Sequence, residues 1–129
     1  MFSYEILEDN GIIVLAVTGQ IAVDDFKVVA PAFFADTRSK GIRKLLLDYR
    51  ELQGRSSKET ENLSFFARIE GRSLFDRAAV VYHPGVRNEA DEIHELFRNA
   101  GKDVRLFRPE QYEAAFEWLK SDSAADALA

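Results

Sequence analysis

The sequence predicts a single α/β domain with a mixed, mostly parallel five-stranded sheet, in the order ββαβαβαβα. Two apolar segments flank Asn10 and Gly11, and an Asn-Gly pair favours an antiparallel hairpin because both residues tolerate positive φ. Beyond this hairpin, short apolar runs alternate with segments of helical periodicity, which is typical of a parallel sheet with crossover helices. The run Leu45–Leu47 shows no apolar–polar alternation, as expected for a strand buried on both faces. We therefore expect right-handed crossovers, with the helices packed on the sheet.

The hairpin is predicted to consist of strands 2–7 and 12–18, followed by a helix over 23–39. Gly19 ends the second strand, and apolar residues then recur at helical spacing. Pro31 lies inside this helix, where its ring removes one backbone hydrogen bond. We therefore expect the helix to be kinked or split in two at this residue.

The remaining chain repeats a strand followed by a helix three times. The first of these strands leads into a predicted loop over 50–54. Gly101 ends the penultimate helix, and Pro109 suits the first turn of the last one. Residues 121–129 are small or polar and are predicted to form a flexible tail, so that the domain spans 1–120. The predicted strands are 43–49, 78–82 and 104–107, and the predicted helices are 57–71, 86–100 and one that begins at Pro109.

The composition excludes several classes of protein. The chain has 129 residues, no Cys and a net charge of −5. Without Cys there is no disulfide, thiol nucleophile or zinc-thiolate site, and the cytoplasm is the expected location. The acidic balance argues against nucleic acids and anionic membranes as partners. We also expect no signal peptide and no membrane span, because no apolar run approaches about 20 residues.

Basic residues follow several of the predicted parallel strands. The carboxyl ends of such strands share one edge of the sheet, which is where ligands bind in open α/β sheets. The candidates for this edge are Tyr49, Arg50, Arg55, His83 and Arg108, and a cluster of the basic residues among them would suit a phosphate or carboxylate. The alternative is that these charges are solvated and pair with acidic neighbours in the same loops.

Two serines stand at the start of the predicted helix 57–71. Ser56 and Glu59 fit a capping box, in which the serine and the glutamate satisfy two backbone amides of the helix entrance. In the alternative, the helix entrance receives an anion beside Arg55, or Ser56 or Ser57 is phosphorylated.

The sequence contains no catalytic signature. It has no Walker loop, no dinucleotide-binding glycine pattern and no nucleophile elbow, and we predict no enzyme activity and no cofactor. A hydrolase that pairs Ser56 or Ser57 with His83 is the least favoured alternative. On the segment Glu89–Glu95, Asp91 shares a helix face with His94, but the spacing of a metal motif is missing, so a solvated face is predicted instead of a metal site.

Ten Phe residues supply a large aromatic stock. Phe33-Phe34 and Phe65-Phe66 are adjacent pairs, and neighbours on a helix cannot both point to the core. Most Phe side chains are predicted to form the core. The others are candidates for a homodimer contact or for the lining of an apolar ligand pocket.

Three segments carry a resemblance to a known family: "VTGQIAVDDF" at 17–26, "KLLLDYRELQG" at 44–54 and "AAFEWL" at 114–119. Together with the Pro-containing helix they resemble the SpoIIAA-like proteins, which are grouped with STAS and CRAL-TRIO domains. The match covers roughly Tyr4 to Leu119. The resemblance implies a SpoIIAA-like (STAS-like) fold and a non-enzymatic binding or regulatory module. The CRAL-TRIO relatives imply an alternative, a carrier of a lipid or other apolar ligand.

The resemblance also bears on the two serines. In STAS anti-sigma-factor antagonists, a phosphorylatable Ser follows the third strand at a helix entrance, within an Asp-Ser motif followed by Gly. Ser56 and Ser57 occupy a similar place, but Arg55 precedes them and Lys58 follows them. We therefore expect a protein partner or a small anionic ligand at the loops after the strands, bound by residues drawn from Tyr49, Arg50, Arg55, Ser56, Ser57, His83 and Arg108.

Overall fold

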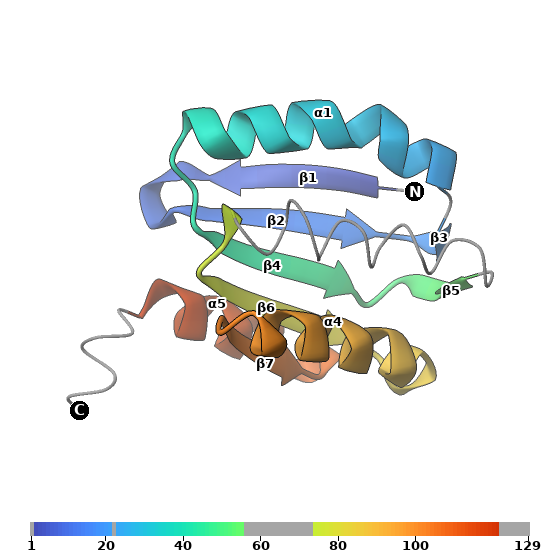
Figure 1. Cartoon of the computed structure of the whole chain (residues 1–129). Helices are drawn as coiled ribbons and strands as arrows, with labels where there is room; N and C mark the ends of the chain where they lie inside the picture. Colours follow the sequence, from blue (N-terminus) through green and yellow to red (C-terminus); the bar gives the residue numbers. More distant parts are fainter. Residues whose placement is uncertain (1, 22, 56–73, 122–129) are drawn as a thin grey trace.

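The structure is a computed structural model that describes residues 2–21, 23–55 and 74–121. Its main sheet has five strands in the order β1-β2-β4-β6-β7 (Figure 1). Strands β1 and β2 are antiparallel, and the pairs β2–β4, β4–β6 and β6–β7 are parallel. The predicted α/β class with its N-terminal hairpin is therefore confirmed. The five strands are Phe2–Leu7, Ile12–Val17, Lys44–Tyr49, Arg77–Tyr82 and Asp103–Phe107.

Three α-helices are described. They are α1 (Val23–Ser39), α4 (Arg87–Asn99) and α5 (Tyr112–Lys120). Short 3₁₀ turns η1, η3 and η4 span Glu8–Asn10, Pro84–Val86 and Pro109–Gln111. The predicted helix 57–71 lies outside the described residues.

The structure differs from the predicted local structure at two places. Helix α1 runs through Pro31 without a break, so of the predicted kink or split, the split does not occur. Pro31 is exposed, and the carbonyl group that its ring deprives of a partner can therefore be solvated. The predicted loop 50–54 contains most of a strand, because β5 (Leu52–Arg55) pairs in parallel with β3 (Gly19–Ile21) in a second small sheet.

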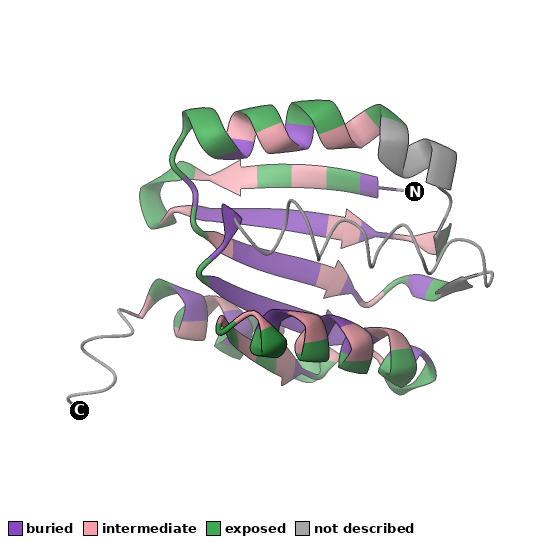
Figure 2. Ribbon diagram, viewed as in Figure 1, coloured by how far each residue is buried: buried purple, intermediate pink, exposed green. Residues whose placement is uncertain are grey.

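The sheet is covered on both faces. On one face, β-strand residues such as Leu45 and Leu47 pack with Phe33 of α1 and Phe97 of α4. On the other face, Leu46 and its neighbours pack with α5. Figure 2 shows the consequence in the mostly purple central strands: β2, β4 and β6 form the core, with α1 and α4 on one face and α5 on the other.

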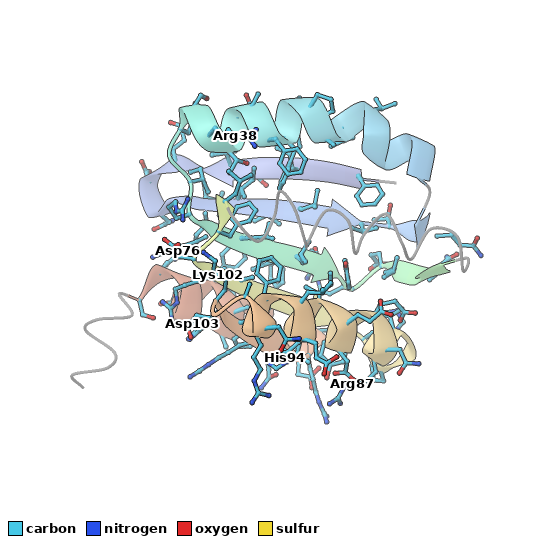
Figure 3. All side chains as sticks on the ribbon, viewed as in Figure 1. Arg38, Asp76, Arg87, His94, Lys102 and Asp103 are labelled. Atoms are coloured by element: carbon cyan, nitrogen blue, oxygen red, sulfur yellow. The ribbon has the colours of Figure 1, made fainter. Side chains whose placement is uncertain are left out.

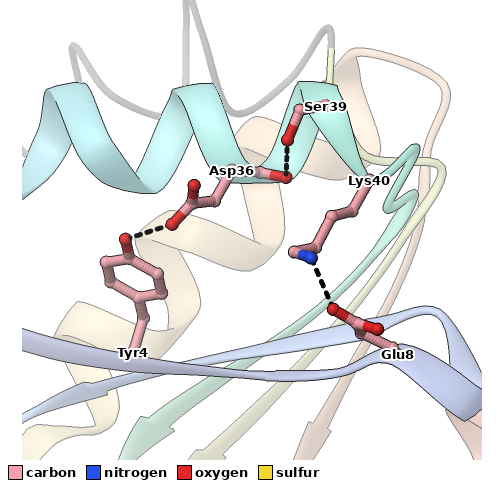
Figure 4. A network of polar contacts seen from close by, with 5 residues as sticks. All are labelled: Tyr4, Glu8, Asp36, Ser39 and Lys40. Atoms are coloured by element: carbon pink, nitrogen blue, oxygen red, sulfur yellow. Dashed lines mark hydrogen bonds and ion pairs between the residues drawn. The ribbon is translucent and has the colours of Figure 1, made fainter.

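Polar contacts hold α1 against the edge strand β1 (Figure 4). The Tyr4 hydroxyl donates to Asp36 Oδ2 at 2.6 Å, and this hydrogen bond raises the pKa of Tyr4 above its ordinary value. Lys40, just past the end of α1, pairs with Glu8 in the hairpin turn. Both pairs join positions 32 residues apart, so they fix how the helix returns onto the hairpin.

Ion pairs also mark the amino end of the parallel strands. Figure 3 labels Asp76, which lies between Arg43 and Lys102 at this end of the sheet. The bidentate hydrogen bonds from Arg43 lower the pKa of the Asp76 carboxyl. No helix within the described ranges is both long and apolar enough to cross a membrane.

Candidate functional site

The loops that follow β2, β4, β6 and β7 lie at one edge of the sheet, because these strands are parallel. At this edge Gly19 adopts φ 67°, a left-handed conformation that favours glycine, and its N–H donates to the Glu51 carbonyl at 3.0 Å. The start of β3, which follows β2, is thereby fixed to the turn after β4. The segments that leave β2 and β4 are therefore connected at the carboxyl-end edge.

His83 bonds through its two ring nitrogens to β5 and to its own turn, η3. Its Nε2 lies 2.6 Å from the Leu52 carbonyl oxygen, and its Nδ1 accepts from the Gly85 N–H at 3.1 Å. Since Nδ1 accepts, Nε2 is the nitrogen that donates to the Leu52 carbonyl oxygen. Both nitrogens are occupied by structural bonds, so His83 in this arrangement supports the edge instead of acting as a general base.

We expect His83→Ala to lower the free energy of unfolding by about 2 kcal/mol, because it removes the hydrogen-bond partners of Leu52 and Gly85. Chemical denaturation followed by circular dichroism measures the loss. The matched control is His94→Ala, since His94 is the other histidine of the chain and lies on α4. Equal losses in the two variants would contradict the connecting role of His83.

A hollow opens at this edge between the ends of β6 and β7. It has a volume of about 230 Å³ and is lined by Tyr82, Pro84, Arg87 and Arg108; we call it the edge hollow. Arg87 starts α4, and its guanidinium carbon lies 5.6 Å from the centre of the Tyr82 ring. Arg108 follows the last residue of β7. Two guanidinium-bearing residues from different elements therefore line one concave surface.

The two arginines differ in their charge partners. Arg87 Nε bonds to Asp91 Oδ1 at 3.1 Å, and this bond raises the pKa of Arg87. Arg108 donates its backbone N–H to the Gln111 side chain at 2.9 Å, which starts η4. Among the described residues, no carboxylate forms an ion pair with the Arg108 guanidinium. Of these two arginines, Arg108 is therefore the better placed to bind an anion from solution.

Arg50, which was predicted for the same cluster, has a carboxylate and an aromatic ring as partners within the fold. Its Nε and Nη2 each bond to Asp48 at 2.9 Å, and its guanidinium carbon lies 3.6 Å from the Tyr112 ring centre. Arg50 therefore connects β4 to α5. Burial, with a further contribution from the negative charge of Asp48, raises the pKa of Tyr112.

The other predicted residues are dispersed. Tyr49 has an exposed fraction of 0% and lies in the core on the side of α1 and α4, the opposite face from the Arg50 contact. Arg55 ends β5, and its side chain is outside the described residues, as are Ser56 and Ser57. The structure brings Arg108 and the backbone beside His83 to the edge hollow. The roles of Arg55, Ser56 and Ser57 stay predictions from the sequence.

Sequence reasoning missed Tyr82 and Arg87. Tyr82 closes an apolar run and was counted as a strand residue alone. The available signal was the segment "YHPGVR", in which a strand ends, Pro84 begins a turn and Arg87 enters a helix. Such a strand-to-helix junction places the first helical side chain at the carboxyl edge.

Three of the Phe residues and part of the acidic segment considered in the sequence have contacts within the fold. Phe33, Phe75 and Phe97 are each fully buried in the core. The acidic face of α4 includes an ion pair between Asp91 and Arg87. Within the described part of the chain, no group of three His, Asp or Glu side chains is placed to hold a metal ion.

Comparison with known proteins identifies the family. A crystal structure of a protein of unknown function with a SpoIIAA-like fold, from Shewanella loihica PV-4, matches with a TM-score of 0.69 and 20% identity over 92% of each chain. The anti-sigma factor antagonist SpoIIAA in its unphosphorylated form matches with a TM-score of 0.59 and 13% identity, over 87% of this chain and 92% of that one. An anti-sigma factor antagonist from Mycobacterium paratuberculosis gives 0.56 and 17%, over 94% of each chain.

At these identities the structural matches establish the fold alone. No protein with a curated function matches the chain. The family evidence comes from the sequence, because the SpoIIAA-like family model matches residues 12–120, which is most of the chain. The predicted resemblance is therefore confirmed, and the chain belongs to the SpoIIAA-like family.

Proposed function

We propose that this protein is a non-enzymatic regulatory module that binds an anionic group, on a protein partner or a small ligand, at the carboxyl-end edge of its sheet. Two structurally similar proteins are anti-sigma factor antagonists, which is consistent with regulation by binding. The role of His83 in holding the edge together also favours binding over acid–base chemistry.

The observation that carries the proposal is the edge hollow. Guanidinium groups suit phosphate and carboxylate because they present several donors in a planar fork. Arg87 and Arg108 both line the hollow, and Arg87 lies at the start of α4, where the helix dipole adds partial positive charge. The chain as a whole carries a net charge of −5. A concave surface with two arginines is therefore a local exception to the charge of the protein.

The test is a titration of ¹⁵N-labelled protein with inorganic phosphate and with O-phosphoserine, followed by two-dimensional NMR. We expect saturable shifts of backbone amides near the edge hollow, between 82 and 88 and between 107 and 111. Arg108→Ala should weaken binding roughly tenfold or more, as expected for the loss of one charge-assisted hydrogen bond.

Arg98→Ala is the matched control. Arg98 is exposed and lies in the last turn of the same helix whose first turn carries Arg87, so it changes the net charge equally without touching the hollow. We expect its affinity to equal that of the unmodified protein. Equal weakening by both variants would reduce the effect to net charge, and shifts spread over the whole surface would refute a site at the hollow.

A further inference from the structure

Strand β7 forms one margin of the main sheet. The strand order ends at β7, and no strand within the described ranges lies beyond it. The Asp103 N–H donates to the Asp76 carbonyl oxygen, so the backbone groups of Asp103 point toward β6. Alternation along a parallel strand then directs the N–H and C=O groups of Val104 and Leu106 outward. Outward backbone groups on an edge strand are a template for pairing with another strand.

The side chains of β7 carry opposite charges two positions apart. Asp103 and Arg105 are both exposed and lie on the face of the sheet that packs with α5, since they pair in register with Arg77 and Ala79. Charged side chains often protect an edge strand against association, and like charges that come to lie opposite each other in a pairing are destabilising. A strand with one negative and one positive charge can instead be complementary to a second copy of itself.

We propose that β7 pairs antiparallel with β7 of a second copy of this chain, with the two-fold axis at Val104. In this register Val104 faces Val104 of the second copy, and their outward backbone groups exchange two hydrogen bonds. Asp103 then faces Arg105 of the second copy, and Arg105 faces its Asp103. These positions form non-hydrogen-bonded pairs, in which side chains approach most closely. The two sheets become one continuous sheet.

The charges select this register over its neighbours. An axis at Arg105 would place the two Arg105 side chains opposite each other, and like charges directly opposite are destabilising. An axis at Leu106 would place Arg105 opposite Phe107 and leave Asp103 beyond the paired strands. The axis at Val104 is the register that forms two opposite-charge pairs at once.

Both side chains are held in place to meet a partner. Arg105 lies over the Trp118 ring, with its guanidinium carbon 5.2 Å from the ring centre. The Asp103 carboxylate lies 3.6 Å from Arg77 Nε, yet 58% of its side chain remains exposed. Ordering of these side chains before association reduces the entropy that association must overcome.

Cysteine cross-linking tests the register directly, because the chain contains no cysteine of its own. We expect Asp103→Cys and Arg105→Cys, mixed and oxidised under mild conditions, to form a disulfide-linked heterodimer. Each variant alone should give little covalent dimer. The Cα atoms of a non-hydrogen-bonded pair lie about 4.5 Å apart, within the range that a disulfide spans. Glu5→Cys, on the opposite edge strand β1, is the control and should not cross-link.

A charge exchange provides the second measurement, by analytical ultracentrifugation. Asp103→Arg should raise the dimer dissociation constant about tenfold or more, because it places two arginines opposite each other at both of the symmetric pairs. The double variant Asp103→Arg with Arg105→Asp should restore the dimer. Disulfide formation by Arg105→Cys alone would overturn the register. A monomer at every accessible concentration, with no cross-linking in the mixture, would overturn the dimer, whatever the outcome for anion binding at the edge hollow.

Discussion

Phe33→Ala is expected to lower the free energy of unfolding by about 4 kcal/mol, because truncation of a fully buried Phe removes its transfer energy and leaves a cavity. Phe33 is the point at which α1 meets the sheet. Its ring lies 5.5 Å from that of Tyr4 in an edge-on arrangement and 6.2 Å from that of Phe75. The cavity would therefore open between β1, α1 and the start of the segment that leads into β6.

Urea denaturation followed by circular dichroism measures this loss. The matched control is Phe34→Ala, which truncates the same residue type one position along the same helix at a half-buried site. We expect this control to cost less than half as much, since less apolar area returns to water. Equal losses would mean that burial of Phe33 does not anchor α1.

The order of elements could be predicted because it depends on local patterns. The unbroken apolar run at Leu45–Leu47 predicted a strand with both faces buried, and all three residues are fully buried. Val86, Ala90, Ile93 and Phe97 recur at helical spacing, and α4 buries the last three of these residues. Such periodicities indicate which face of a helix or strand packs on the core, and they can be read from the local sequence alone.

Strand β5 could not be predicted in the same way. Its sequence, Leu52–Arg55, is short, contains Gly54 and alternates weakly. It becomes a strand because β3, more than 30 residues earlier, offers a parallel partner. Pairing between such distant segments leaves no local periodicity.

The sequence predicted one of the residues that line the edge hollow. The rule that ligands bind at the carboxyl ends of parallel strands predicted Arg108 for this edge, and Arg108 lines the hollow. It also predicted Arg50, which forms an ion pair with Asp48 two residues earlier and lies over the Tyr112 ring of α5. A charge in a loop can be assigned to solvent, to structure or to a ligand only when its neighbours in space are known.

The two proposals are compatible in geometry. An antiparallel arrangement of β7 strands directs the carboxyl ends of the two sheets in opposite directions. Arg108 follows the last residue of β7 and would lie farther along the strand from the two-fold axis at Val104 than Arg105 does. A dimer would present two edge hollows at opposite ends of one sheet. Binding of an anionic group at one hollow therefore need not compete with association.

Arg77→Ala is expected to lower the free energy of unfolding by about 3 kcal/mol, through lost hydrogen bonding and lost stacking. Arg77 opens β6 with an exposed fraction of 5%. Its Nη1 donates to the Ser121 carbonyl at 2.6 Å, and its guanidinium carbon lies 4.2 Å from the centre of the Trp118 ring. The Arg77 side chain thus connects the C-terminal end of α5 to the start of β6.

Arg77→Lys separates charge from geometry. Lysine keeps the positive charge but lacks the planar fork that stacks on Trp118 and reaches the Ser121 carbonyl, so we expect it to recover less than half of the loss. Arg105→Ala is the matched control on the same ring. Because Arg105 is exposed and its guanidinium carbon lies farther from the ring centre, at 5.2 Å, its removal should cost about 1 kcal/mol or less. If Arg77→Lys restored full stability, charge alone would account for Arg77, and the stacked contact would not be what holds α5 to the sheet.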